Sequence, residues 1–405
     1  MPSRPEPSAA AATGSTRSSV LVLALAAFFS GAALRICDGL LPRLAADFGI
    51  TAGTAGQVVL TFAIAYGVSQ LVFGPLGDRY GKALVVCCAL FGCAGAALAC
   101  AFAGGFDMLL RLRVLWGIAA GGVIPLAIAW IGDAVPYEER QATLARLLLG
   151  TLSGMSAGQL GGGLFADSPL GWRGAFGALC AGYVVIAVML LARLRSMPSA
   201  PPAQGGRLAF FPQLAAVAAI PWARLVVGAA LLEGVFLIGA LAFLPSYLHQ
   251  RFGIPLSAAG ALVALYAVGG LLYAMAAKPI VRRLGERRMV LHGGWIVGAG
   301  FAAWAVAPAA WWAGPIALVV GFGTYMFHNT LQTHATQMAP AMRGSGMALF
   351  AFCLFLGQAI GVWMAGASFD RFGALPLLLL PAVALPLTGW GFSAALRRRA
   401  GAAAA

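Results

Sequence analysis

The loop at residues 74–82 reads GPLGDRYGK and lies at the end of an apolar run over 52–76. A related loop at residues 278–287 reads KPIVRRLGER and lies at the end of an apolar run over 256–280. Three pairs of residues recur in these loops at a spacing of 204: Pro75 and Pro279, Arg79 and Arg283, and Gly81 and Gly285. The recurrence indicates that the chain consists of two halves built alike.

Two further places support this internal repeat. Pro136 and Pro340 are again 204 residues apart, and the motif Gly158-Gln159 recurs as Gly357-Gln358 at a spacing of 199. Twelve apolar runs follow the same division, six before and six after a polar stretch: 19–42, 52–76, 83–104, 107–132, 142–166 and 174–194, then 224–247, 256–280, 288–308, 310–336, 344–367 and 374–396. A duplicated six-helix unit predicts a central cavity between the two halves.

The composition places these helices in a membrane. The chain has 405 residues, of which 61% are hydrophobic and only 9% charged, whereas about 25% of a soluble domain is charged. Each run is long enough to cross a bilayer, which takes roughly 20 residues. We therefore predict an all-α membrane protein with twelve transmembrane helices in two pseudo-symmetric six-helix bundles. The predicted parts are a disordered tail (1–18), the first bundle (19–195), a linker (196–222), the second bundle (223–396) and a second tail (397–405).

Positive charge predicts the orientation. The net charge is +14, and 19 of the 26 Lys and Arg residues fall in the tails, the linker and alternate loops. Because such residues favour the cytoplasmic side, both termini and the linker are expected in the cytoplasm of a multi-pass protein of the inner membrane. The charges do not form a stripe for nucleic acid. The seven cysteines lie in apolar runs without metal-type spacing, and no phosphate-binding GxxxxGK[ST] loop occurs, so neither a metal nor a cofactor is expected.

Four of the charged residues within the predicted spans are candidates for function, because charge in a span is expensive and usually functional. Asp38 is in the first span and Glu233 is in the seventh, which is its partner in the repeat. Desolvation disfavours the charged form of a carboxylate, so both are candidates for proton coupling. Arg35 precedes Asp38 by three residues and can neutralise it in a local pair. Arg113 is either functional, as charges within spans usually are, or an arginine that reaches the membrane surface.

Polar and aromatic side chains in other spans are candidates for lining the cavity. His328, Asn329 and Gln332 share one span at helical spacing; they either face the cavity or join helices through hydrogen bonds. With Arg35, the predicted cavity residues are Tyr66, Trp116, Gln159, Tyr266, His328, Asn329 and Gln332.

The loop at 74–82 closely resembles the loop signature of the major facilitator superfamily. The resemblance implies a latch that joins the two halves at the cytoplasmic end in the outward-facing state. The implied latch residues are Gly74, Asp78, Arg79, Gly81 and Lys82.

Three further segments resemble the drug:proton antiporter branch of this family. Arg113-Val-Leu-Trp116-Gly117 resembles a second signature, which implies that Arg113 couples proton movement to conformation. Asp38, followed four residues later by proline, resembles the first span of these antiporters. Gly154, Gly158 and Gly162 resemble the antiporter glycine motif, although Gln159 replaces its usual proline. That replacement weakens the implication of export, and plain glycine packing is the alternative.

The sequence therefore predicts a secondary transporter of a small molecule, and not an enzyme. The first hypothesis is proton-coupled efflux of an amphipathic or drug-like compound by a monomer, with protons and membrane lipid as its other partners. The second is proton-coupled import of an anionic metabolite, vitamin or metal, for which Arg35 adds positive charge to the cavity. The third, an intramembrane enzyme or a sensor, leaves the two-half repeat without a use.

Overall fold

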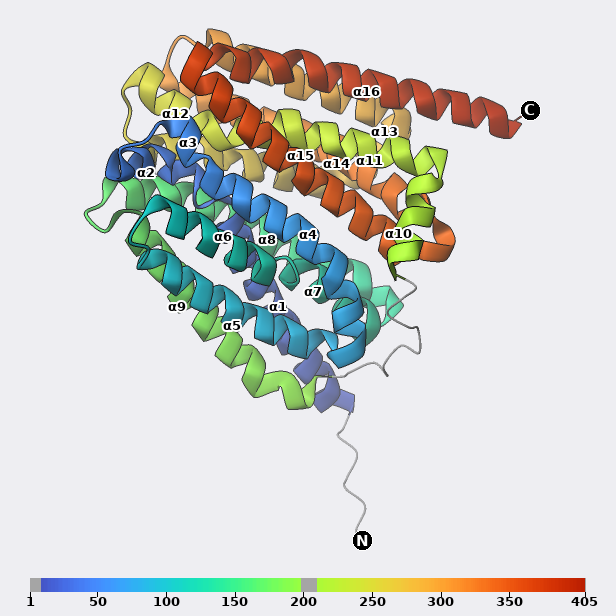
Figure 1. The fold of residues 1–405 in the computed structure, drawn as a ribbon. Coiled ribbons are helices and arrows are strands. Elements are labelled where there is room, and N and C mark those ends of the chain that lie inside the picture. Colours follow the sequence, from blue (N-terminus) through green and yellow to red (C-terminus); the bar gives the residue numbers. More distant parts are fainter. Residues whose placement is uncertain (1–8, 198–209, 405) are drawn as a thin grey trace.

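The computed structural model describes residues 9–197 and 210–404, and every regular element in these ranges is helical. Figure 1 shows the helices running roughly along one common direction. The start of α1 and the end of α16 lie at one end of the bundle, here called the terminal end, while α2 and α3 lie at the other, here called the opposite end.

The first half contains nine α-helices and two short 3-10 turns. They are α1 (Ala9–Arg35), η1 (Asp38–Leu40), α2 (Leu41–Phe48), α3 (Ala52–Ala55), α4 (Gln57–Tyr80), α5 (Lys82–Ala101), α6 (Phe106–Ala120), α7 (Val123–Ala134), α8 (Tyr137–Asp167), α9 (Gly171–Arg193) and η2 (Leu194–Ser196).

The second half follows the same course from residue 210. It comprises α10 (Phe210–Ala219), α11 (Pro221–Glu233), η4 (Gly234–Ile238), α12 (Gly239–Phe252), α13 (Leu256–Val306), η5 (Ala310–Trp312), α14 (Ala313–Gln337), η6 (Pro340–Met342), α15 (Arg343–Phe372) and α16 (Leu375–Ala404).

Ten helical segments of the described chain are long and apolar enough to cross a membrane. One of them is α13, whose 51 residues are interrupted at Gly285, where φ is 67°. A continuous helix of that length would extend about 77 Å, more than twice the hydrocarbon thickness of a bilayer, so the break at Gly285 allows α13 to cross twice. The 31-residue helix α8 is not among the ten. The arrangement is consistent with the twelve predicted spans.

Glycines set the closest contacts within each half. A Cβ atom on Gly154 of α8 would lie 2.0 Å from the carbonyl oxygen of Phe28 in α1, and one on Gly158 would lie 2.3 Å from that of Ala32. In the second half, a Cβ on Gly357 of α15 would lie 2.1 Å from the carbonyl oxygen of Leu231. No side chain fits at such distances, so the predicted glycine packing is confirmed, and it occurs in both halves.

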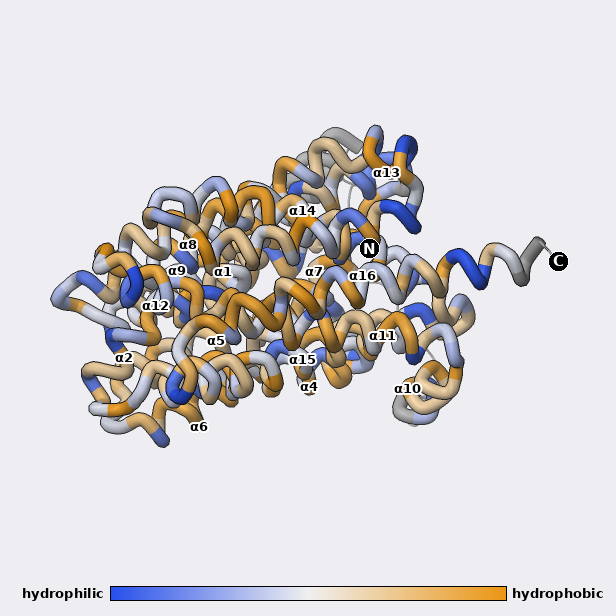
Figure 2. The backbone as a smooth tube through the Cα atoms, turned by 90° about the horizontal axis from the view of Figure 1, so that it is seen from above, coloured by the Kyte–Doolittle hydropathy of each residue, from blue (hydrophilic) through white to orange (hydrophobic). Residues whose placement is uncertain are grey.

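Apolar residues continue around the outside of the bundle. Figure 2 shows hydrophobic positions along most of the helices, with hydrophilic residues gathered at the turn of α13 and near the end of α16. The lipid-facing side chains include large exposed ones such as Trp295, Trp363 and Trp390. This surface suits lipid as the solvent.

The helix boundaries differ from the predicted domain boundaries in three places. Helix α1 begins at Ala9, inside the predicted tail 1–18, of which residues 1–8 lie outside the described residues. Within the predicted linker 196–222, residues 198–209 also lie outside them, and α10 is a helix. At the end of the chain, α16 continues through the predicted tail to Ala404. Small helix-forming residues such as alanine extend the helices beyond the apolar runs.

Candidate transport site

The first buried ion pair lies where α1 ends. One guanidinium nitrogen (Nη1) of Arg35 donates a hydrogen bond to Oδ2 of Asp38 over 3.3 Å, and Asp38 is completely buried in the turn η1. The predicted local pair is thereby confirmed. The second carboxylate oxygen, Oδ1, has no hydrogen-bond partner among the described residues. A buried acceptor in this position is available for a proton or a ligand.

The second buried pair joins two helices of the second half. Nδ1 of His328 in α14 lies 3.0 Å from both carboxylate oxygens of Glu233, which is the last residue of α11 and is 1% exposed. Directly after Glu233, the backbone widens into the π-helical turn η4 (Gly234–Ile238). Such turns in α-helices frequently mark functional sites. The separation of 95 positions between the partners explains why no neighbour of Glu233 was evident in the sequence.

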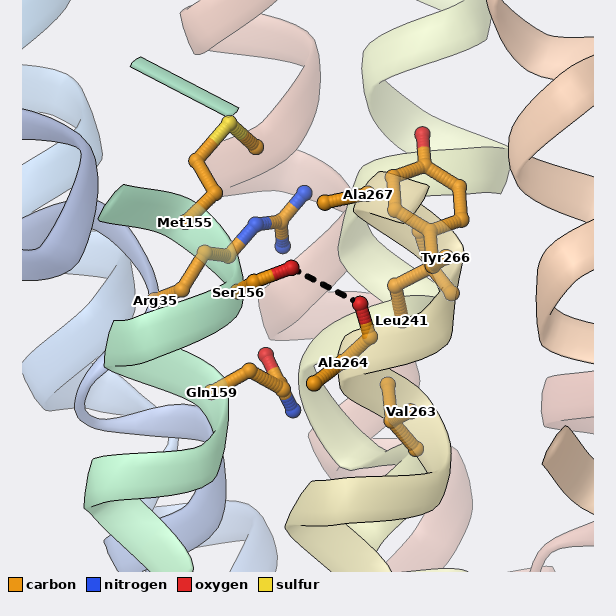
Figure 3. A pocket seen from close by; sticks show the side chains of 9 residues that line it. All are labelled: Arg35, Met155, Ser156, Gln159, Leu241, Val263, Ala264, Tyr266 and Ala267. Atoms are coloured by element: carbon orange, nitrogen blue, oxygen red, sulfur yellow. Dashed lines mark hydrogen bonds between the residues drawn. The ribbon is translucent and has the colours of Figure 1, made fainter. Parts of the chain in front are cut away.

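A small pocket lies between the halves beside the first pair. Its volume is about 20 Å³, which holds about one water molecule. Figure 3 shows the side chains around it, and Oγ of Ser156 in α8 donates a hydrogen bond across the boundary to the carbonyl oxygen of Ala264 in α13 over 2.9 Å. The pocket is lined by Arg35, Met155, Ser156, Gln159, Leu241, Val263, Ala264, Tyr266 and Ala267.

Three of the predicted cavity residues therefore meet in this pocket: Arg35, Gln159 and Tyr266. Nε2 of Gln159 has no hydrogen-bond partner in the described part of the chain, so it is a free donor at the pocket wall. The ring of Tyr266 lies 6.4 Å from that of Tyr325 in α14. Tyr266 thus brings an aromatic ring of the second half to the same pocket as Arg35 of the first half.

Arg113 and Trp116 lie in the core of the first half. Nε of Arg113 donates to the carbonyl oxygen of Val58 over 3.1 Å, and its guanidinium lies 4.1 Å from the ring centroid of Phe62. Arg113 is 1% exposed, so the alternative of an arginine reaching the membrane surface is wrong. Trp116 is completely buried and packs on Phe62, Phe176 and Tyr183. Its surroundings are those of a core residue, away from the residues that line the pocket.

The remaining candidates take different places. Tyr66 of α4 crosses the boundary and packs on Phe355 of α15, with ring centroids 4.5 Å apart. Asn329 donates to the hydroxyl of Tyr273 over 3.2 Å, which is the predicted alternative of a hydrogen bond between helices. Gln332 follows His328 by one helical turn on the same side of α14, but its side chain is exposed. The three polar residues of α14 therefore do not form one group at the cavity, although the helical spacing suggested it.

The predicted latch loop pairs within its own half. Nζ of Lys82 lies 3.4 Å from Asp78, whose side chain is half exposed, and also forms an ion pair with Asp133 at the end of α7. Arg79 lies 5.1 Å from the ring centroid of Tyr80, and Gly81 adopts a positive φ of 93°, which favours glycine. Gly74 has open space around it.

Ser156 is a site residue that the sequence did not single out, whereas Tyr325 is one of the aromatic residues in the spans that could line a pocket for a planar ligand. Ser156 lies between two packing glycines of α8, and that position places it at the boundary between the halves. Tyr325 precedes His328 by three residues, which puts both on one side of α14. The spacing to His328 was the available signal for Tyr325.

Comparisons with known proteins agree with this architecture. The model of the Major Facilitator Superfamily matches residues 23–362. The chain is 14% identical to the solved nucleoside transporter NupG, with a TM-score of 0.77 over 93% of this chain and 99% of that one. This likeness shows a common fold.

Two curated relatives are similar over a shorter range. The chain is 30% identical over 181 residues to a 4-hydroxybenzoate transporter of Pseudomonas aeruginosa, which is 43% of this chain and 39% of the relative. It is 30% identical over 158 residues to a chloramphenicol resistance protein of Streptomyces lividans, which is 39% of this chain and 40% of the relative. The matched segments thus span about two fifths of each relative's length. With a family match over most of its helices, this multi-pass membrane protein belongs to the Major Facilitator Superfamily, whose members transport small molecules and are not enzymes.

Proposed function

We propose that the chain is a twelve-span, proton-coupled carrier of small organic anions that works by alternating access. The observation that supports this function is the buried pair of Arg35 and Asp38 at the edge of the pocket between the halves. Protons and membrane lipid are the other partners, and the monomer is the working unit. The termini face the cytoplasm of the inner membrane.

The pair links proton binding to anion binding. A buried guanidinium needs an anionic partner, and Arg35 has Asp38 in that role. Protonation of Asp38 removes its charge and releases Arg35 for the carboxylate of a substrate. Each ligand therefore favours the binding of the other, and this linkage is reciprocal. A carrier of this kind moves the proton and the anion in the same direction.

The surroundings of Arg35 favour an aromatic acid. Tyr266 lines the same pocket as Arg35 and offers a ring face for stacking, and the ring of Tyr325 lies 6.4 Å behind it. Gln159 adds a free donor at the pocket wall, which suits a hydroxyl or carboxyl oxygen. The 4-hydroxybenzoate transporter among the relatives transports a compound with these groups. We therefore infer that the substrates are small aromatic carboxylates.

Proton-coupled efflux of an amphipathic compound is the second candidate, and a lateral groove supports it. The groove has a volume of about 280 Å³ and is lined mainly by apolar side chains, among them Val235 and Phe236 of η4 and Trp363 of α15. Val235 and Phe236 follow Glu233 in the chain by two and three residues. An amphipathic cation entering from lipid would compete with a proton for this carboxylate. The chloramphenicol resistance protein among the relatives agrees with this candidate.

The direction of proton movement distinguishes the two functions. Purified protein is reconstituted into liposomes that contain a pH-sensitive dye, and either 4-hydroxybenzoate or a lipophilic cation such as ethidium is added. Proton entry together with the aromatic acid supports anion symport. Proton exit that depends on the cation supports efflux instead. Flux of either compound without a proton signal contradicts both coupling schemes.

Glu233→Gln is expected to change the pH dependence of transport. The substitution removes a titratable group while keeping a side chain of the same size beside His328. Initial uptake rates across a series of pH values measure the effect, with Glu286→Gln as a control, because Glu286 also pairs with a histidine but is half exposed. An unchanged profile would remove Glu233 from the proton path.

Asp78→Asn is expected to slow transport without weakening substrate binding. Asp78 lies near the end of α4 beside Lys82 and is not among the residues that line the pocket, so it acts on conformational change in this proposal. The measurement compares the maximal uptake rate with the equilibrium dissociation constant of the substrate. A large loss of binding would contradict the latch role.

A further inference from the structure

Two aspartates at the opposite end of the bundle each reach across the boundary between the halves. Oδ1 of Asp167, the last residue of α8, accepts a hydrogen bond from the backbone N–H of Leu256 over 3.2 Å, and Oδ2 accepts one from Ser257 over 2.7 Å. In the same way, Oδ1 of Asp370 accepts a hydrogen bond from the backbone N–H of Gly53 over 2.9 Å. One carboxylate thus comes from each half.

The two contacts are related by the internal repeat. Asp370 follows Asp167 by 203 residues, and Ser257 follows Gly53 by 204, close to the repeat spacing of the loops. Each aspartate lies at the end of a long helix, and each partner lies at the start of a helix in the other half. The same chemistry at both symmetry-related positions is difficult to attribute to chance.

The donors are groups that need a partner. The first N–H groups of a helix have no acceptor within the helix, and the positive end of the helix dipole favours an anion there. The hydroxyl of Thr51 adds a hydrogen bond to Oδ2 of Asp370 over 2.6 Å. Hydrogen bonds to a charged carboxylate are stronger than those between neutral groups. The aspartates therefore accept hydrogen bonds from backbone N–H groups that would otherwise donate to water.

The backbones approach closely at the same level. A Cβ atom on Gly163, one turn before Asp167, would lie 2.2 Å from the carbonyl oxygen of Leu256. One on Gly53 would lie 2.2 Å from the carbonyl oxygen of Gly366, one turn before Asp370. The helices of the two halves are thus in direct contact beside each carboxylate, and no space remains there for a substrate to pass.

Asp167 is charged in this position. Burial raises the pKa of its carboxyl group, but hydrogen bonds from the side chain and backbone of Ser257 and from the backbone of Leu256 outweigh that effect and keep the pKa below its usual value. The residue lies just beyond the predicted span 142–166, at the aqueous edge of the bundle.

We propose that Asp167 and Asp370 are positioning residues that hold the opposite end of the carrier closed, and that both must release their helix partners before that end opens. The latch loop with Asp78 lies at the terminal end, where its ion pairs remain within the first half. The two aspartates therefore act at the end of the bundle that the Asp78 loop does not reach. The inference rests on the alternating access of the proposed function, but not on its substrate.

Distance measurements between spin labels test this role in the full chain. Labels on Leu170→Cys and Phe372→Cys, both exposed and close in sequence to the two aspartates, report the separation of the halves at this end by double electron–electron resonance. The native cysteines are replaced in a background that still transports. The labels are closer together when the opposite end is closed than when it is open. Loss of one charged contact is expected to shift the equilibrium between these two forms roughly tenfold toward the open one.

The variants are Asp167→Asn, Asp370→Asn and the double variant, with Asp47→Asn as the matched control. Asp47 lies at the same end, but it pairs with Arg43 inside its own half. We expect a partial shift in each single variant, a larger one in the double variant and none in the control. The maximal transport rate should fall while equilibrium substrate binding remains, which a merely structural defect would not produce.

Unchanged distances in both single variants would overturn the proposal, even if the double variant does not fold. Opening that is as large in Asp47→Asn as in the other variants would overturn it as well, because general destabilisation would then explain the shift. Failure of anion transport with the distance shift intact would contradict the proposed substrate and leave the role of the aspartates standing.

Discussion

Asp38→Asn is expected to abolish the accumulation of substrate driven by a proton gradient while exchange of labelled for unlabelled substrate continues. The substitution keeps the shape of the side chain but removes the proton site. It also releases Arg35, whose guanidinium pairs with this carboxylate over 3.3 Å. Substrate binding should therefore become tighter at high pH and nearly independent of pH.

The size of the effect follows from the coupling. With one proton per anion, a gradient of two pH units supports roughly a hundredfold accumulation, because each factor of ten corresponds to about 1.4 kcal/mol. Asp38→Asn should reduce this ratio to about one. Uptake and exchange are measured in the same proteoliposomes. Asp47→Asn is the control, since it removes a carboxylate from a partly exposed guanidinium pair nearby in the chain. Full accumulation by the Asp38 variant would exclude this residue as the proton site.

Arg35→Gln is expected to weaken substrate binding and with it transport at low substrate concentration. A hydrogen bond to a charged group contributes about 1.5–3 kcal/mol, which corresponds to roughly 10- to 150-fold in affinity. The substitution also leaves Asp38 buried without its partner, and breaking a buried pair costs about 3–5 kcal/mol in stability. Binding and thermal unfolding must therefore be measured together.

Two further variants separate these effects. Arg111→Gln removes an exposed arginine from α6 and should change neither affinity nor stability. The double variant Arg35→Gln with Asp38→Asn removes both charges, so stability should recover while binding stays weak. Recovery of binding along with stability would show that Arg35 serves the fold and does not contact the substrate.

Together the two single variants distinguish coupling from binding. Asp38→Asn keeps the anion site and loses the proton, whereas Arg35→Gln loses the anion site. A carrier of lipophilic cations would respond differently, because removal of the guanidinium would not weaken the binding of a cation. The pair of substitutions thus also tests the choice between the two proposed functions.

Much of the fold could be predicted from the sequence because the bilayer imposes simple rules. Apolar length marks helices that can cross, and the recurrence of Pro75, Arg79 and Gly81 at Pro279, Arg283 and Gly285 marks the repeat. The structure confirms the all-helical fold and places the break of α13 at Gly285. The family was also indicated by the loop at 74–82, and the match over residues 23–362 confirms it.

The parts of the site that are close in sequence were also predictable. Arg35 and Asp38 are three residues apart, so local geometry brings them together. The tight glycine contacts of α8 with α1 followed from small residues at helical spacing. In each case the interaction joins residues that are close in the chain, or needs only that a neighbouring helix can approach.

Only the tertiary structure decided which distant residues meet. It pairs Glu233 with His328, buries Trp116 in the core of the first half, exposes Gln332 and joins Asp167 and Asp370 to helix starts in the opposite halves. The physical reason is that the rotation of each helix about its axis is set by its packing partners. Apolar length determines that a helix crosses the membrane, but the neighbouring helices determine which of its faces reaches the pocket.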